Sequence, residues 1–182
     1  MDRRQIKTRR AIIGAFTELL EEKGYSAITI QDIVDRADIG RSTFYSHFDA
    51  KDDLLNGLCE DIFDHVFSGG GKEATHDFSG SRDLGDELTH ILYHIREKKD
   101  SIRSILSSES GDVFMKYFRL HLKDLFSRNA VSVPEGIPED YVISAGAGSF
   151  SEAVRWWIDN DNYSPEEIAG FFLESIRPGI FT

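Results

Sequence analysis

Residues 29–51 have the sequence TIQDIVDRADIGRSTFYSHFDAK, and this stretch decides the fold. Apolar residues recur there at helical spacing on both sides of a short break at Gly40, which predicts two short helices at about 29–37 and 41–48. Thr29 fits an N-cap for the first helix. Two short helices joined by a three-residue turn that contains glycine fit a helix-turn-helix.

The outer face of the second helix determines whether this pair could bind DNA. Phe44 and Phe48 lie four residues apart and can anchor the helix to a core. The other side chains can reach base edges and phosphates: Arg41, Ser42, Thr43, Tyr45, Ser46 and His47. No acid occurs between Asp38 and Asp49, as a helix that faces phosphates requires. Helix-turn-helix patterns also arise by chance in helical proteins, so periodicity by itself leaves the function open.

The net charge of −11 is unevenly distributed along the chain. Residues 1–51 hold 9 Lys+Arg and 8 Asp+Glu, so their net charge is +1 and that of the remainder is −12. Five cations fall within the first ten residues: Arg3, Arg4, Lys7, Arg9 and Arg10. This pattern indicates a small basic tip on an acidic body. A nucleic-acid-binding end and a merely solvated helix start both account for it.

The fold class predicted for all 182 residues is all-α, because apolar residues recur at helical spacing almost throughout. We expect an N-terminal three-helix helix-turn-helix domain over 1–51 and a larger helical domain over 52–182. Residues 68–81, which include three consecutive glycines, are predicted to be a flexible break. Further helices are expected at about 7–23, 50–66, 82–98, 100–108, 111–129, 139–160 and 165–177.

Composition excludes several classes of protein. The 40% apolar content supports a core, and no stretch approaches the roughly 20 apolar residues of a membrane-spanning helix. The acids that follow the first apolar run argue against a signal peptide. The single cysteine, Cys59, cannot form an internal disulfide, which suits a reducing compartment. We expect a soluble cytoplasmic protein.

Motifs for catalysis, metal binding or cofactor binding are not recognisable. His90 and His94 have a spacing that lets two imidazoles share a metal, but nothing in the sequence supplies a third ligand, so an ordinary histidine pair is favoured. The Gly-rich segment 69–72 fails the phosphate-loop pattern. We therefore expect no enzyme activity, no metal and no cofactor.

The segment from Lys23 to Leu54 resembles the DNA-binding domain of the TetR (tetracycline-repressor-like) family. The matching positions are Lys23-Gly24-Tyr25, Thr29 to Ile33, Ala37, Thr43 to Phe48, Lys51 and Leu54, and the resemblance covers about residues 6–55. It implies a homodimeric bacterial transcription factor, usually a repressor, that a small ligand releases from its operator.

The resemblance also implies roles for individual residues. Thr29, Tyr45, His47 and Lys51 match positions that touch phosphates, whereas Arg41, Ser42, Thr43 and Ser46 match positions that contact bases or the adjoining backbone. The sequence departs from the family pattern at Asp38, where glycine is usual, at Gly40, where serine is usual, and at Ser42, where glycine is frequent. These departures are expected to loosen the turn or to shift sequence preference.

In the family, the last two long helices form a four-helix bundle with their copies. The small residues 144–149 lie inside a predicted helix, where each glycine costs about 1 kcal/mol against alanine. Close approach of a neighbouring helix, in this chain or in a partner, would compensate, although a kinked core helix is the alternative. The dimerisation residues expected are Gly146, Gly148, Ser149, Trp156, Phe171 and Phe172.

Together these features predict a ligand-responsive DNA-binding regulator, a repressor that binds a palindromic operator as a homodimer. The small-molecule effector, the operator and the regulated genes do not follow from the sequence. The alternative is a protein-interaction adaptor or co-regulator in which the DNA-binding domain has a secondary role.

Overall fold

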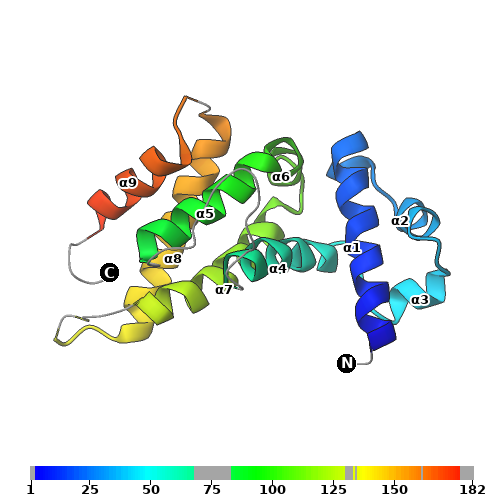
Figure 1. The fold of residues 1–182 in the computed structure, drawn as a ribbon, viewed down its shortest axis with the longest axis horizontal. Helices are drawn as coiled ribbons and strands as arrows, with labels where there is room; N and C mark the ends of the chain where they lie inside the picture. The colour runs from blue at the N-terminus through cyan, green and yellow to red at the C-terminus, as the bar shows by residue number, and fades with distance from the viewer. Residues whose placement is uncertain (1–2, 68–82, 130–132, 134, 161, 177–182) are drawn as a thin grey trace. The chain divides into compact units, whose positions relative to one another are not determined.

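The computed structural model describes residues 3–67, 83–129, 133, 135–160 and 162–176. Within these residues the regular structure is helical and contains no strand, which confirms the all-α prediction (Figure 1). The predicted break at 68–81 and the predicted end of the last helix at 177 lie outside the described residues.

The helices follow the predicted order. Their bounds are α1 (Arg3–Lys23), the 3-10 helix η1 (Tyr25–Ala27), α2 (Ile30–Arg36), α3 (Arg41–Tyr45), α4 (Asp53–Phe67), α5 (Leu84–Glu97), α6 (Lys99–Leu106), α7 (Gly111–Asn129), α8 (Glu139–Asp159) and α9 (Pro165–Ser175). Three bounds differ clearly from expectation, one of them the start of α4, which lies at Asp53 instead of at about residue 50. α1 begins about one turn earlier, within the basic segment, and α3 ends at Tyr45 instead of at residue 48.

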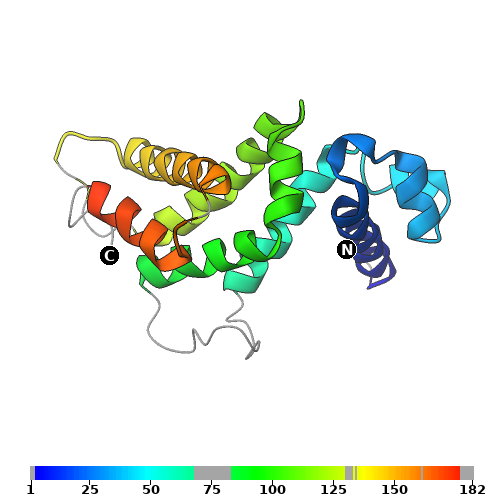
Figure 2. The same cartoon turned by 90° about the horizontal axis from the view of Figure 1, so that it is seen from above.

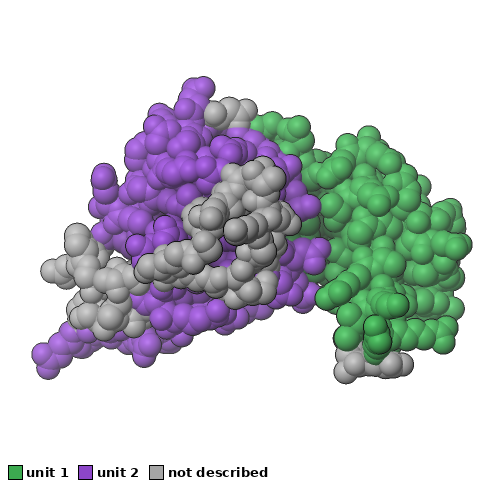
Figure 3. Space-filling model, viewed as in Figure 1, with its two compact units in different colours: residues 1–59, 100–114 green, residues 60–99, 115–182 purple. Residues whose placement is uncertain are grey.

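The chain forms two compact units (Figure 3). Residues 1–59 and 100–114 form the first, and residues 60–99 and 115–182 form the second. The first unit thus contains α6 and the start of α7 in addition to the helix-turn-helix. The domain boundary at residue 51 stays a prediction.

In the first unit α1 packs against α2, and α2 packs against α3 (Figure 1). Gly24 ends α1 with a φ of +72°, a conformation that favours glycine. A Cβ atom on Gly24 would lie 2.7 Å from the Oγ of Ser104 in α6, and the backbone N–H of Tyr25 donates to that same Oγ at 2.9 Å. Glycine at this position therefore allows the chain to turn and leaves room for Ser104 of α6.

In the second unit α5 packs along α9, and α8 packs against α9 (Figure 2). The ring of Phe172 lies 5.8 Å from that of Phe126 and 5.1 Å from that of Phe150, between centroids. The start of α9 is as predicted: Ser164 and Glu167 form a capping box, with a proline in the first turn.

The turn between α2 and α3 contains a backbone feature that explains one departure from the family pattern. Asp38 has a φ of +52° and is the only non-glycine residue of the described chain in the left-handed region. A glycine adopts this conformation without strain, and aspartate tolerates it better than most other residues. Asp38 therefore keeps the turn conformation that the usual glycine provides.

Replacing Asp38 tests this account of the turn. We expect Asp38→Ala to lower the free energy of unfolding by about 1 kcal/mol, because alanine is strained at positive φ, and Asp38→Gly not to lower it. Glu21→Ala, at an exposed position of α1, is the control and should change it by less than about 0.5 kcal/mol. Urea denaturation measures all three, and equal values for Asp38→Ala and the control would contradict the account.

Candidate nucleic-acid interface

Two buried phenylalanines hold the α3 segment in place. Phe44 is completely buried, Phe48 is 4% exposed, and their ring centroids are 5.8 Å apart. The guanidinium of Arg9, from the basic part of α1, lies 4.8 Å from the centroid of the Phe48 ring. The predicted anchoring by both phenylalanines is confirmed, and it fixes which face of α3 points outward.

The predicted DNA-contacting residues of α3 and the turn after it lie at the surface. Arg41, Ser42, Tyr45 and Ser46 are exposed, and Thr43 and His47 are half-buried. The Tyr45 ring packs edge-on against Phe44 at 5.4 Å, and the Ser46 hydroxyl donates to the Thr43 carbonyl at 2.7 Å. The face is thus acid-free, polar and accessible, and contact of each residue with DNA stays a prediction.

Thr29 has a structural role at the start of α2. Its Oγ accepts from the backbone N–H of Asp32 at 3.2 Å, and its own N–H donates to the Asp32 carboxylate at 2.7 Å. Lys23 lies 2.8 Å from the same carboxylate. Hydrogen bonds from Lys23 and then from Thr29 hold the pKa of Asp32 well below its usual value. The predicted capping of α2 is confirmed, and the exposed Thr29 stays at the surface where a phosphate contact is predicted.

Lys51 is half-buried and already engaged within the first unit. Its Nζ donates to the carbonyl oxygens of Tyr25 and Ile28, both at 3.0 Å, and lies 4.1 Å from the centroid of the Tyr25 ring. Burial lowers the pKa of Lys51, and the neighbouring Asp52 opposes this shift. Two of the three donors of the ammonium are thus engaged within the protein, and contact of Lys51 with a phosphate stays a prediction.

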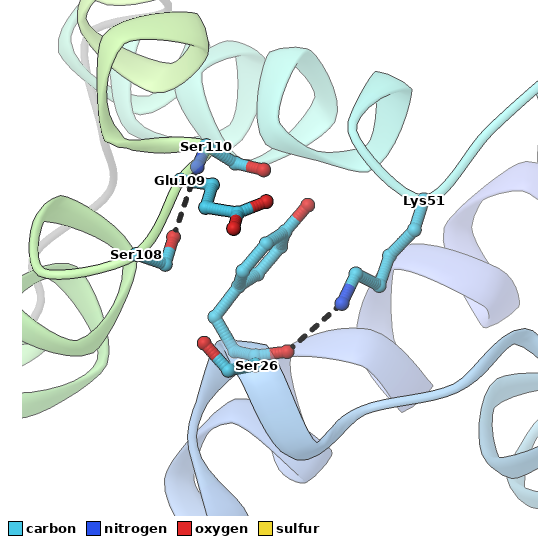
Figure 4. A pocket seen from close by; sticks show the side chains of 6 residues that line it. Ser26, Lys51, Ser108, Glu109 and Ser110 are labelled. Carbon is cyan, nitrogen blue, oxygen red and sulfur yellow. Dashed lines mark hydrogen bonds between the residues drawn. The ribbon is translucent and has the colours of Figure 1, made fainter.

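A polar hollow of about 340 Å³ lies beside Lys51 (Figure 4). Its lining consists of Tyr25, Ser26, Lys51, Ser108, Glu109 and Ser110. Next to it, Asp52 Oδ1 accepts from the Tyr25 hydroxyl and from Ser110 Oγ, the latter at 2.9 Å. Burial and then the Asp52 hydrogen bond raise the pKa of Tyr25. This network connects the α6–α7 turn with η1 and the start of α4.

One feature of the surface was not predicted from sequence. Gln31 of α2 accepts a hydrogen bond from Nε of Arg41 at 2.8 Å, and its own Nε2 donates to Asp35 Oδ1 at 2.7 Å. The spacing of Gln31 and Asp35 is a typical intrahelical pair. The contact with Arg41 depends on how α2 and α3 cross, which no local pattern encodes.

The predicted dimerisation residues separate into two groups. Gly146 is buried, and Phe172 is only 3% exposed and packs on other core rings. The helical phase turns both residues toward the interior of this chain, and their contact with a second copy stays a prediction. Gly148, Ser149, Trp156 and Phe171 lie on the outward faces of α8 and α9.

His90 and His94 form a buried pair on α5. Their Nε2 atoms are 3.1 Å apart, and His94 Nδ1 lies 3.3 Å from Glu97 Oε2. In the described part of the chain, no group of three or more His, Cys, Asp or Glu side chains could hold a metal ion.

None of the described helices is long and apolar enough to span a bilayer.

Comparison with known proteins identifies the family. Residues 12–58 match the family described as bacterial regulatory proteins, tetR family, and residues 83–178 match the family described as transcriptional regulator C-terminal region. A solved structure of a TetR transcriptional regulator from Streptococcus agalactiae is 35% identical, with a TM-score of 0.63 and coverage of 95% of each chain.

Curated relatives agree with this result. The chain is 28% identical to the HTH-type transcriptional regulator YerO of Bacillus subtilis, over 91% of this chain and 62% of YerO. It is 25% identical to the HTH-type transcriptional repressor KstR2 of Rhodococcus jostii, over 92% of this chain and 91% of KstR2. A match to YxbF of Bacillus subtilis covers 19% of that protein, so the chain spans less than two thirds of both Bacillus relatives.

A helix-turn-helix held by two buried phenylalanines, followed by a helical C-terminal region, is the arrangement of a DNA-binding transcriptional regulator. The chain belongs to the TetR family of these regulators.

Replacing Tyr45 tests the predicted contact between the exposed side of the α3 segment and DNA phosphates. It is 51% exposed, and phenylalanine keeps its packing on Phe44 while removing the hydroxyl. We expect Tyr45→Phe to weaken binding about tenfold on every DNA sequence, because a hydrogen bond to a charged group contributes about 1.5 kcal/mol or more. Ser107→Ala, which also removes an exposed hydroxyl but lies in the turn after α6, is the control and should have no effect. Fluorescence anisotropy measures both, and equal affinities would exclude this contact.

Proposed function

We propose that this regulator is a ligand-responsive repressor that acts in the bacterial cytoplasm and binds a palindromic operator as a homodimer. The observation that carries the DNA-binding mode is the exposed, acid-free face of α3 on two buried anchors. α3 would lie in the major groove of each half-site. The basic first turns of α1 would add affinity that does not depend on sequence. The similarity to KstR2, which is named a repressor, supports repression.

Selection of bound DNA from a random pool tests this proposal. We expect enrichment of a two-fold symmetric site, because each protomer of a symmetric dimer presents one α3. Binding to that site should fall steeply with salt, as phosphate contacts require. A pool without an enriched sequence would overturn the proposal, and an asymmetric site would overturn the homodimeric mode.

The outward face of α8 supports dimerisation. Its exposed residues include Tyr141, Ala145, Ser149 and Trp156, and a Cβ atom built on Gly148 would meet nothing within 4 Å. Small residues in the middle of the face allow a second helix to approach closely. The occupant that fits this face is α8 of a second copy, as the resemblance to the family implies.

An exposed aromatic cluster continues this face onto α9. The ring centroids of Trp156 and Tyr163 are 5.5 Å apart, and those of Tyr163 and Phe171 are 5.4 Å apart. Trp156 and Phe171 are each 49% exposed. Contiguous exposed apolar side chains of this kind mark interaction surfaces, and aromatic residues are enriched in interfaces.

Glycine-to-alanine substitutions distinguish an interface from an open helix face. Alanine favours helix by about 1 kcal/mol, so Gly148→Ala should stabilise an isolated protomer. If a partner helix crosses at Gly148, the added methyl group should instead weaken the dimer about tenfold through overpacking. Gly14→Ala, at a similarly open position of α1, is the control. Sedimentation equilibrium measures dimerisation, and equal behaviour of the two variants would contradict an interface at Gly148.

Regulation by a small molecule would act as a population shift, in which the effector binds better when the two α3 helices do not fit the operator. The chain passes between the two units at 59/60, 99/100 and 114/115. Within the first unit, Ser104 and Ser110 tie α6 and the α6–α7 turn to η1 and α4. These contacts support a route by which changes in the second unit reach the DNA-binding helices.

A further inference from the structure

The cations between α2 and the start of α4 have different partners. Arg36 is paired with Glu18 at 3.1 Å and with Glu22 at 2.7 Å, so its charge is neutralised within the protein. Lys51 donates to two backbone carbonyls. Arg41 is exposed, and its one hydrogen-bond partner among the described residues is the neutral amide of Gln31. Arg41 therefore presents its full positive charge at the surface.

The Gln31 amide has a defined orientation. A carboxylate can only accept and a guanidinium can only donate, so one amide orientation satisfies both neighbours. In that orientation Nε2 donates to Asp35 Oδ1 at 2.7 Å, and Oε1 accepts from Arg41 Nε at 2.8 Å. Asp35 thus fixes the orientation of the Gln31 amide, and the Gln31 amide holds the Nε atom of Arg41 in place.

This arrangement selects one edge of Arg41 for DNA. A guanidinium can offer two donors in parallel through its Nε/Nη edge or through its Nη1/Nη2 edge. Because Gln31 occupies Nε, the Nη1/Nη2 edge is the one that retains both donors. A bidentate contact of arginine with guanine O6 and N7 is the commonest specific contact in the major groove.

We propose that Gln31 and Asp35 are positioning residues that hold Arg41 with its Nη1/Nη2 edge ready to contact one guanine in each half-site. The inference rests on the proposed operator binding. Holding the side chain before binding reduces the rotamer freedom that is lost when the contact forms. Gln31 and Asp35 act through Arg41, so their effect is confined to the base pair that Arg41 contacts.

The test first locates that base pair. With the selected operator, Arg41→Ala should reduce the preference for guanine at one position of each half-site by about tenfold, and leave preferences elsewhere unchanged. The measured quantity is the ratio of Kd values for operators that differ only at this position. A structural defect would change both Kd values together and leave the ratio unchanged.

Three variants then test the positioning residues. Gln31→Met keeps the length of the side chain but removes the acceptor, and should reduce the guanine preference about three- to tenfold. Asp35→Ala should reduce it to a lesser extent. Asp35→Asn removes the same charge as Asp35→Ala but keeps a carbonyl acceptor for Gln31, so it should retain the parental preference.

The outcomes separate this inference from the proposed function. If Arg41→Ala changes the preference but Gln31→Met does not, the positioning role is wrong and the operator contact stands. A Gln31→Met variant that alters preference at a different base pair would show that Gln31 contacts DNA itself, which also overturns the positioning role. If Arg41→Ala leaves every preference unchanged, or no operator is selected, the DNA contact assigned to Arg41 fails together with the positioning role.

Discussion

Burial of Phe44 and Phe48 is the constraint on which the DNA-binding surface depends. A helix of five residues is too short to be stable in isolation, so tertiary packing must hold α3. The two rings meet this need from one side of the segment. As a consequence, the polar side chains on the opposite side of the segment lie at the surface.

The same unit uses several of its cations to hold its helices together. Arg36 joins α2 to α1 through Glu18 and Glu22, and Lys23 joins the end of α1 to Asp32. Exposed ion pairs of this kind contribute little to stability, but they neutralise charge locally. Residues 39–48 hold one arginine, Arg41, and no acid, so this segment presents no negative side chain although residues 1–51 contain eight.

The packing of α6 extends the DNA-binding unit beyond the helix-turn-helix. Gly24 admits Ser104 by its lack of a side chain, and Asp52 receives hydrogen bonds from Tyr25 and Ser110. These polar contacts join α6, η1 and the residue before α4 within the first unit.

The sequence by itself determined the helix order, the caps at Thr29 and Ser164, and the two aromatic anchors of α3, because each is a local pattern of spacing and side-chain chemistry. Tertiary structure decided the hydrogen bond between Gln31 and Arg41, the inward position of Phe172, and the place of α6 beside Gly24. These features depend on the crossing of helices distant in sequence and on the rotational phase of each helix against its neighbours. Adjacent positions on a helix are about 100° apart, so the rotational phase of α9 against its neighbours decides that Phe172 is buried and Phe171 is exposed.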